Sequence, residues 1–137
     1  MMPRRRAVEH PKMFDDDDPV LARVRQITLR LPEAAEKVSH GRPAFYTRKI
    51  FAYYGGSQKV HGEWVQHPTS VMVLADLDGQ SAMRALPNAW VPGYLGPYGW
   101  TGLDLSEGTD WDDVTGFIEE SYRFTAPARL TALLDES

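Results

Sequence analysis

Apolar residues recur at helical spacing in two stretches of the chain. In the first stretch they are Val20, Val24, Ile27 and Leu31. Four aspartates at residues 15–18 and Pro19 precede it, which is typical of a helix start because carboxylates favour the positive end of the helix dipole and proline fits the first turn. Pro32 predicts the end of this helix, and residues 32–38 are expected to add a short helical turn.

The second helical stretch lies near the C-terminus. Its apolar positions are Trp111, Val114, Ile118 and Tyr122. Asp110 is expected to open this helix, and Pro127 is expected to end it. Shorter helices are predicted over residues 80–86 and 128–134, the first of which is stopped by Pro87.

Between the helices, β-branched and aromatic residues predict strands. The predicted strands are residues 43–47, 50–54, 59–65, 70–75 and 100–105. Arg48 and Lys49 separate the first two strands, which indicates a tight hairpin, and the Gly-Gly-Ser sequence at residues 55–57 is expected to end the second one. Residues 59–65 are expected to be irregular, whereas residues 70–75 are the most convincing buried strand.

This order of elements predicts an α+β fold, an antiparallel β-sheet meander covered on one face by the N-terminal and C-terminal helices. With 137 residues and 42% hydrophobic composition, the chain fits one domain with a sizeable core. We expect residues 1–14 to be a flexible basic tail and residues 15–137 to form the single domain. No internal repeat and no linker between two cores is visible.

Composition limits the chemistry and the compartment. The chain has no cysteine, which excludes disulfides, thiolate nucleophiles and thiolate metal sites and favours a cytoplasmic location. No apolar run approaches the roughly 20 residues that a membrane span needs, so no membrane association is expected.

The net charge of −4 is unevenly distributed. Residues 103–137 hold nine acidic residues against two arginines, and the residues before them carry a net charge of +3. Residues 37–62 contain no acid and interleave basic with aromatic residues, which favours a local surface for an anionic partner. The candidate nucleic-acid-binding residues are Arg42, Arg48, Lys49, Lys59, Tyr53 and Trp100.

Several short motifs, in their order and spacing, resemble the MmcQ/YjbR family. They are Leu31-Pro32-Glu33, Ser39-His40-Gly41-Arg42-Pro43-Ala44-Phe45, Lys49-Ile50-Phe51-Ala52, Pro92-Gly93-Tyr94-Leu95-Gly96, Gly99-Trp100 and Ser121-Tyr122. The resemblance covers residues 18–130 and implies a small cytoplasmic domain with a CyaY-like, or double-wing, arrangement of sheet and helices. DNA binding is attributed to this family by analogy of fold, and the family offers no established catalytic or cofactor residue to carry over. Thr47 and Arg48 stand where many relatives have glycine, which predicts a stiffer, more basic hairpin tip.

Residues 91–105 alternate aromatic residues, glycines and prolines. Their glycines do not form a dinucleotide-binding motif, because they follow no clear strand and lead into a strand instead of a helix. The aromatic residues suit either a core or an interface. The candidate partner-interface residues are Trp90, Tyr94 and Tyr98.

Histidines are the remaining candidates for chemistry. His61, Glu63 and His67 could in principle hold zinc, but polar loop histidines are the favoured interpretation since zinc needs three or four converging ligands. His40 could act as a base with Glu36, four residues earlier, although a helix-capping role is favoured. No serine-hydrolase elbow and no phosphate-binding loop is present. We therefore assign no catalytic residue, metal or cofactor.

Three classes of function are compatible with these patterns. The favoured one is a non-enzymatic module that binds DNA or another anionic partner through the basic aromatic hairpin. The second is a protein-interaction or homodimerisation domain that uses the aromatic loop. The third is a small-molecule-binding protein or an enzyme with a pocket near His40.

Overall fold

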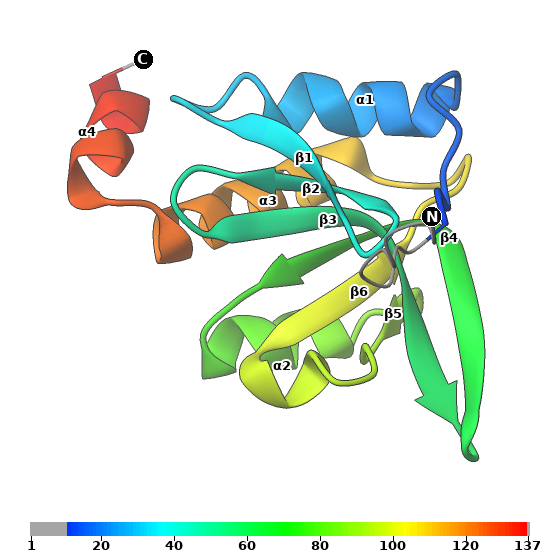
Figure 1. Cartoon of the computed structure of the whole chain (residues 1–137). Coiled ribbons are helices and arrows are strands. Elements are labelled where there is room, and N and C mark those ends of the chain that lie inside the picture. The colour runs from blue at the N-terminus through cyan, green and yellow to red at the C-terminus, as the bar shows by residue number, and fades with distance from the viewer. Residues whose placement is uncertain (1–10, 137) are drawn as a thin grey trace, which may run out of the picture.

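The computed structural model describes residues 11–136. Along the chain, the elements are α1 (Pro19–Thr28), β1 (Ala35–Ser39), β2 (Arg42–Tyr46), β3 (Ile50–Val60), β4 (Glu63–Leu74), α2 (Leu77–Arg84), β5 (Ala89–Trp90), the 3-10 helix η1 (Gly96–Tyr98), β6 (Trp100–Asp104), α3 (Trp111–Thr125) and α4 (Ala128–Glu136) (Figure 1). None of the described helices is long and apolar enough to cross a membrane.

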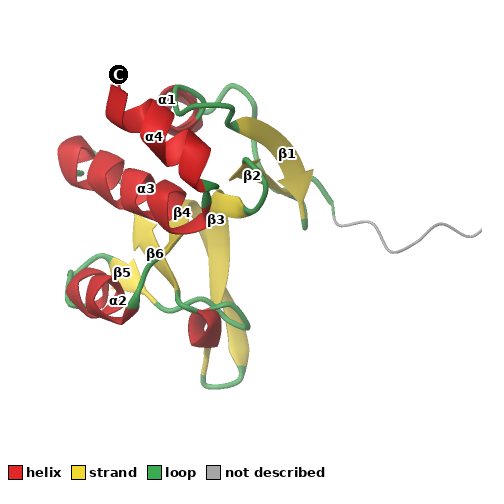
Figure 2. Ribbon diagram, turned by 90° about the vertical axis from the view of Figure 1, so that its left-hand side faces the viewer, coloured by secondary structure: helices red, strands yellow, loops and turns green. Residues whose placement is uncertain are grey.

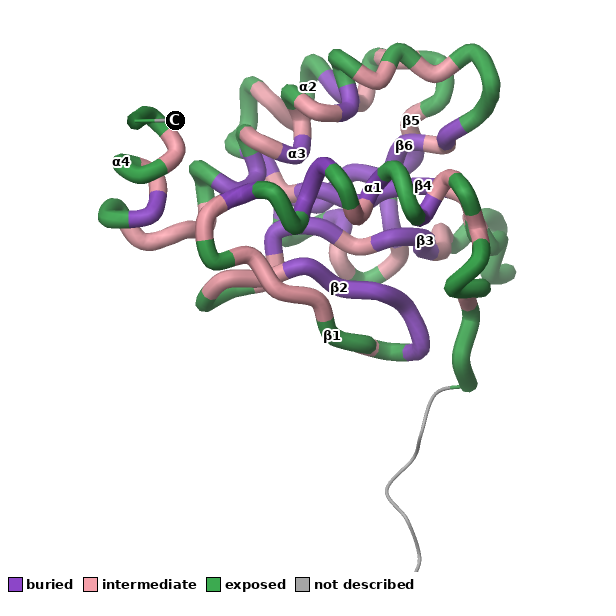
Figure 3. The backbone as a smooth tube through the Cα atoms, turned by 90° about the horizontal axis from the view of Figure 1, so that it is seen from above, coloured by how far each residue is buried: buried purple, intermediate pink, exposed green. Residues whose placement is uncertain are grey.

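The six strands form one antiparallel sheet in the order β1-β2-β3-β4-β6-β5. Helices α1 and α3 pack on the same face of this sheet, and β3 and β4 continue beyond it as a long hairpin (Figures 1 and 2). The main core fills the space between the helices and the sheet and includes Leu21, Phe45, Val73, Ile118 and Tyr122. Buried positions are accordingly concentrated in the central strands and on the inner sides of the helices (Figure 3). The predicted α+β fold is confirmed, with the edge strands β1 and β5 added to the meander and residues 63–74 forming one strand, β4, where a break was predicted.

The predicted helix starts follow from side-chain capping. The Asp18 carboxylate accepts the Val20 amide (2.9 Å) before α1, with Pro19 at its first position. Asp110 caps α3 in the same way, by accepting the amides of Asp112 (3.0 Å) and Asp113 (3.3 Å). These bonds satisfy donors that a helix leaves unpaired at its N-terminus.

The helical turn predicted over residues 32–38 is wrong. Residues 35–39 form β1, which pairs with β2 along its whole length, from Ala35 opposite Tyr46 to Ser39 opposite Arg42. Helix α1 also ends at Thr28, earlier than the predicted stop at Pro32. Strand pairing with a distant segment overrides the local preference of such a short stretch.

The predicted strand end at residues 55–57 is also wrong. Strand β3 passes through these residues to Val60, and a bulge between Tyr54 and Gly56 accommodates Gly55, whose φ is +81°. A two-residue turn then separates β3 from β4, within the segment predicted as an irregular strand. Its residues, His61 and Gly62, both have left-handed backbone conformations, as two-residue hairpin turns of type I′ require.

The tail predicted over residues 1–14 lies mainly outside the described residues. In the last part of this segment, the Met13 amide donates to the carbonyl of Gly41 (2.8 Å), and Phe14 packs against the main core. These two residues therefore contact the domain.

The face of the sheet opposite α1 and α3 is called here the open face. Val71 and Val73 of β4 point into the main core, so Met72 between them points to the open face. A second apolar cluster forms there from Met72, Trp90 and Trp100, with Ile50, Tyr53, Leu74 and Leu95 packed against it. The segment between β5 and β6 approaches this cluster and forms one side of the candidate site.

Candidate ligand-binding site

A cavity of about 560 Å³ opens on the open face and is called here the open-face cavity. Strands β3 and β4 contribute Tyr53, Gly56, Ser57, Trp64, Gln66 and Met72 to its lining. The segment around the β1–β2 turn contributes Ser39, His40 and Arg42, the segment before α1 contributes Met13, and the segment after β5 contributes residues 92–95. Four parts of the chain that are distant in sequence thus enclose one space.

Arg42 is the charged residue of this lining. It is the first residue of β2, and only 7% of its surface is exposed. Its Nη2 donates to Oε1 of Gln66 (2.5 Å), which lies on β4. Burial lowers the pKa of the Arg42 guanidinium, because desolvation disfavours its charged form. Arginine nevertheless keeps its proton in proteins, so a positive charge lies at the cavity.

Gly55 makes the space that the Arg42 guanidinium occupies. A Cβ atom at position 55 would lie 2.4 Å from Nη1 of Arg42 and 3.3 Å from the carbonyl oxygen of Pro68. The residue also has a φ of +81°, which side chains disfavour. The bulge in β3 is therefore the local feature that places the guanidinium.

The segment between β5 and β6 is held in place by main-chain and arginine contacts. Arg84 of α2 donates from Nη2 to the carbonyls of Gly96 (3.0 Å) and Trp100 (2.9 Å), and from Nε to Oγ1 of Thr101 (3.0 Å). On the cavity side, the Gly93 amide donates to the carbonyl of Ser57 (3.0 Å). The segment is thus fixed at both ends against the sheet.

Trp64 closes the cavity from the β3–β4 hairpin. Its ring lies against Gly93, where an added Cβ would be only 2.3 Å from Cζ3. Trp64 also packs against the Tyr94 ring, with centroids 5.3 Å apart and planes inclined by 44°. Tyr94 has a left-handed φ of +62° and is 76% exposed, so the loop presents this aromatic ring at the cavity rim.

His67 and Trp90 form a separate, closed arrangement on β4 and β5. Their rings stack at 4.1 Å with an angle of 11°. Nδ1 of His67 lies 2.8 Å from the Asp104 carboxylate, and Nε2 lies 2.7 Å from Oε1 of Gln58. Both ring nitrogens are therefore engaged. Within residues 11–136, no three histidine or acidic side chains gather in a way that could hold a metal ion.

The candidate nucleic-acid-binding residues occupy three different places. Arg42 is buried at the cavity, Arg48 and Lys49 are exposed in the β2–β3 turn, and Lys59 is exposed near the far end of β3. An extended strand rises about 3.3 Å per residue, so the 11 residues of β3 separate the last two places by roughly 33 Å. These four basic residues do not form one patch.

Of the two aromatic candidates for base stacking, one faces the cavity. Tyr53 lines it and is partly exposed. Trp100 is buried and meets Tyr53 edge to face, with centroids 5.3 Å apart and planes inclined by 61°. Trp100 therefore does not present a ring face to the cavity in this structure.

The candidate interface residues also divide. Trp90 is buried in its stack on His67 and covers Gly102, where an added Cβ would lie 2.2 Å from Cε2 of the indole. Tyr94 and Tyr98, by contrast, are 76% and 78% exposed. Only these two present their rings to solvent.

The open-face cavity contains part of the pocket that was predicted near His40. His40 and Trp64 line the open-face cavity. Glu36 does not, because its carboxylate accepts two hydrogen bonds from Arg25 of α1 (2.9 and 2.8 Å). The acid–base pair considered for His40 and Glu36 is therefore not assembled at the cavity.

Three contributors to the site were not identified from the sequence: Trp64, Gln66 and Arg84. Gln66 and Arg84 act through contacts with residues far along the chain, which no local pattern indicates. The adjacent glycines 55 and 56 could have indicated the site, since glycine within a strand pattern often marks a bulge or a place where another group approaches the main chain closely.

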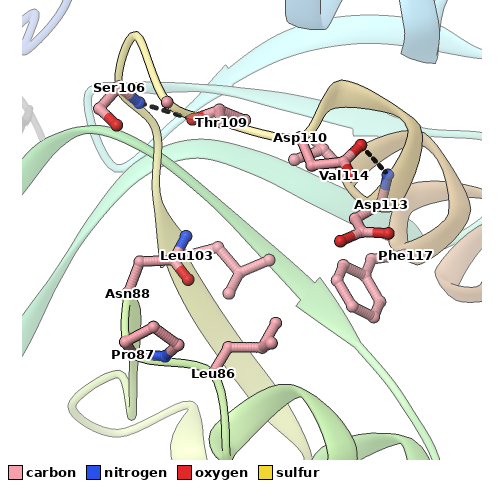
Figure 4. Close-up of a pocket in the computed structure, with 11 residues that line it drawn as sticks. Leu86, Pro87, Asn88, Leu103, Ser106, Thr109, Asp110, Asp113, Val114 and Phe117 are labelled. Atoms are coloured by element: carbon pink, nitrogen blue, oxygen red, sulfur yellow. Dashed lines mark hydrogen bonds between the residues drawn. The ribbon is translucent and has the colours of Figure 1, made fainter.

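A second hollow, of about 430 Å³, lies between the start of α3, β6 and residues 86–88 (Figure 4). Some of its polar groups are already used locally. Asp110 accepts the amide of Asp113, and Oγ1 of Thr109 accepts the amide of Ser106 (2.7 Å). No basic side chain belongs to the described lining, which makes this hollow a poorer binding site than the open-face cavity.

The sequence profile of the YjbR family matches residues 29–124, more than half of the chain. The chain belongs to the YjbR family. A crystal structure of a protein from Pseudomonas syringae is similar to this YjbR-family protein, with a TM-score of 0.59 and 10% sequence identity over 77% of this chain and 97% of the other. No curated protein matches the chain. At such low identity the structural likeness shows the fold alone, so the function must be argued from the site.

Proposed function

We propose that this YjbR-family protein is a binding protein that takes a small planar molecule into the open-face cavity. The lining carries the proposal. It combines the aromatic rings of Tyr53, Trp64 and Tyr94 with few polar groups, and its volume of about 560 Å³ lies within the roughly 300–1,000 Å³ usual for ligand pockets.

The described lining favours binding over catalysis. It contains no carboxylate that could act as a general acid or base beside His40. Aromatic side chains on a fixed loop and hairpin provide a large contact area at low conformational cost, which suits recognition of a flat ligand.

A neutral aromatic probe, 2-naphthamide, tests the proposal. In a ¹H–¹⁵N NMR titration, the largest shifts are expected at the Trp64 indole and at the amides of Gly56 and Gly93. Ser57→Trp would fill the cavity and should weaken binding at least about tenfold. The matched control is Ser81→Trp, on the exposed surface of α2, which should leave the affinity unchanged. Shifts confined to other surfaces, or equal binding by both variants, would disprove the cavity as the site.

A second candidate function is binding of single-stranded nucleic acid at the cavity rim. It is supported by the exposed Trp64–Tyr94 pair and by the Lys59 ammonium, which lies 5.2 Å from the centroid of the Trp64 ring. Bases can stack on such rings while a nearby lysine neutralises a phosphate.

Fluorescence anisotropy with single- and double-stranded oligonucleotides distinguishes this function. Single strands should bind better, with log K falling by about 0.7 per log unit of salt for each neutralised phosphate. Trp64→Ala should weaken binding by about 1–3 kcal/mol for each lost base stack. The double variant Arg48→Gln/Lys49→Gln serves as the comparison, because it removes two positive charges away from the rim, whereas Trp64→Ala removes a ring at the rim and no charge. A larger loss in the double variant than in Trp64→Ala would contradict binding at the rim.

A further inference from the structure

Arg42 has no ion pair in the described structure and so differs from three other arginines. Arg25, Arg123 and Arg129 each have a carboxylate partner, and their side chains are 25%, 43% and 65% exposed. Arg42 is much more buried, yet within residues 11–136 no carboxylate lies within ion-pair distance of it. A buried charge without a counter-charge is costly, so this arrangement needs a physical reason.

The hydrogen bond from Arg42 orients the guanidinium without neutralising it. Gln66 offers a neutral amide oxygen, and in the described part of the chain it is the hydrogen-bond partner of the Arg42 side chain. A guanidinium has five N–H donors, so most of them remain available. Gly55 holds the other side of the group by letting Nη1 approach the main chain. The result is a positioned cation beside an aromatic cavity.

We propose that the ligand of the open-face cavity carries an oxyanion, a carboxylate or a phosphate, which binds the Arg42 guanidinium. The planar part of the ligand then lies against Tyr53 and Trp64. This inference rests on the proposed function and adds the chemical class of the ligand. Guanidinium binds both oxyanions through paired, charge-assisted hydrogen bonds.

A peptide or a nucleic acid is a less suitable source of the oxyanion. Arg42 as a whole residue is 7% exposed and its side chain belongs to the lining of a cavity, so a group that enters the cavity is best placed to reach the guanidinium. A small molecule with one flat ring system and one terminal oxyanion meets this requirement.

Two probes of nearly equal shape, 2-naphthoate and 2-naphthamide, test the inference, with 2-naphthyl phosphate as a third. Their dissociation constants are measured by NMR titration of the wild-type protein. We expect 2-naphthoate or 2-naphthyl phosphate to bind about 10- to 100-fold more tightly than 2-naphthamide, the gain typical of a charge-assisted hydrogen bond. The tighter of the two anions identifies carboxylate or phosphate as the preferred group.

The decisive variant is Gln66→Glu, which places a carboxylate where the amide oxygen already contacts Arg42. It keeps the shape of the cavity and neutralises the cation from within. The ratio of the dissociation constants of 2-naphthamide and the anionic probes should fall to about one in this variant, whatever its affinity for 2-naphthamide itself. Arg42→Gln should give the same loss of preference, and Arg42→Lys should retain part of it because lysine keeps the charge but not the fork.

The outcomes separate this inference from the proposed function. If 2-naphthamide binds in the cavity but the anionic probes gain nothing, or if their gain persists in Gln66→Glu, the oxyanion inference is wrong and the cavity proposal stands. If no probe shifts the cavity residues, both are wrong. Loss of the anionic preference in Gln66→Glu, with 2-naphthamide still shifting the cavity residues of the wild type, supports both.

Discussion

The substitution Gly55→Ala tests how the bulge in β3 positions Arg42. The new methyl group would lie 2.4 Å from Nη1 of Arg42, closer than two such atoms can approach. The carbonyl of Pro68, at 3.3 Å, leaves the main chain little room to adjust. The guanidinium must therefore move away and give up its bond to Gln66.

The magnitude follows from two contributions, and the chain offers a control for one of them. Gly62, in the turn of the same hairpin, has nearly the same φ (+83° against +81°) but no atom within 4 Å of an added Cβ. Gly62→Ala should therefore cost only the backbone term, about 1 kcal/mol. Gly55→Ala adds displacement of a charged hydrogen-bonding group and local overpacking, a further roughly 1–3 kcal/mol.

Urea denaturation of the wild type and both variants measures these values, with unchanged m-values showing that the unfolding transition is comparable. The same variants are titrated with 2-naphthoate and 2-naphthamide. Gly55→Ala should lose more stability than Gly62→Ala and should bind the two probes alike. Equal losses of stability, together with a full preference for 2-naphthoate in Gly55→Ala, would refute the role given to the bulge.

Three further predictions concern the supports of the site and the core. Burial, with the hydrogen bond to Asp18, raises the pKa of Tyr54, so this phenol ionises at lower pH in the unfolded state than in the folded one. The free energy of unfolding should therefore fall above pH 10, by up to about 1.4 kcal/mol per pH unit. An equally steep fall in a Tyr54→Phe variant would contradict this. Gly93→Val should displace Trp64, shift tryptophan emission to the red and weaken binding of 2-naphthamide, whereas Gly108→Val, with open space around it, should not. Gly116→Ala, in the exposed middle of α3, should stabilise the protein by about 0.5–1 kcal/mol in urea denaturation, and a destabilised variant would show that this helix is packed differently.

Local signals predicted the starts of α1 and α3 because their causes are local, whereas the helix predicted over residues 80–86 begins earlier, at Leu77, and ends at Arg84. Asp18 with Pro19, and Asp110, start their helices through contacts within three residues, so the sequence contains the whole interaction. Strand β1 could not be predicted in this way. Its residues have no strand pattern of their own and become a strand by pairing with β2.

The predicted end of β3 at residues 55–57 was wrong because paired glycines have two structural uses. Within a strand pattern, Gly55 and Gly56 can end the strand or form a bulge that admits another group. The group admitted here is the Arg42 guanidinium, whose position depends on β2, β3 and β4 together. That information is spread over residues 42–66 and is not visible in any short window.

The basic residues show the same limit. In the sequence, residues 37–62 carry basic side chains without an acid, which indicates one positive surface. In the fold, Arg42 points to the cavity, while Arg48 and Lys49 lie in a turn at the other end of β3 from Lys59. Arg42 remains a candidate for an anion, but as an isolated cation in a cavity.

A crystal structure of the protein with 2-naphthoate bound would show directly whether the open-face cavity holds an aromatic oxyanion. We expect the fused rings in the cavity beside Tyr53 and Trp64, with the carboxylate oxygens within hydrogen-bond distance of the Arg42 guanidinium. A ligand bound elsewhere on the molecule, or in the cavity with its carboxylate turned away from Arg42 into solvent, would contradict it.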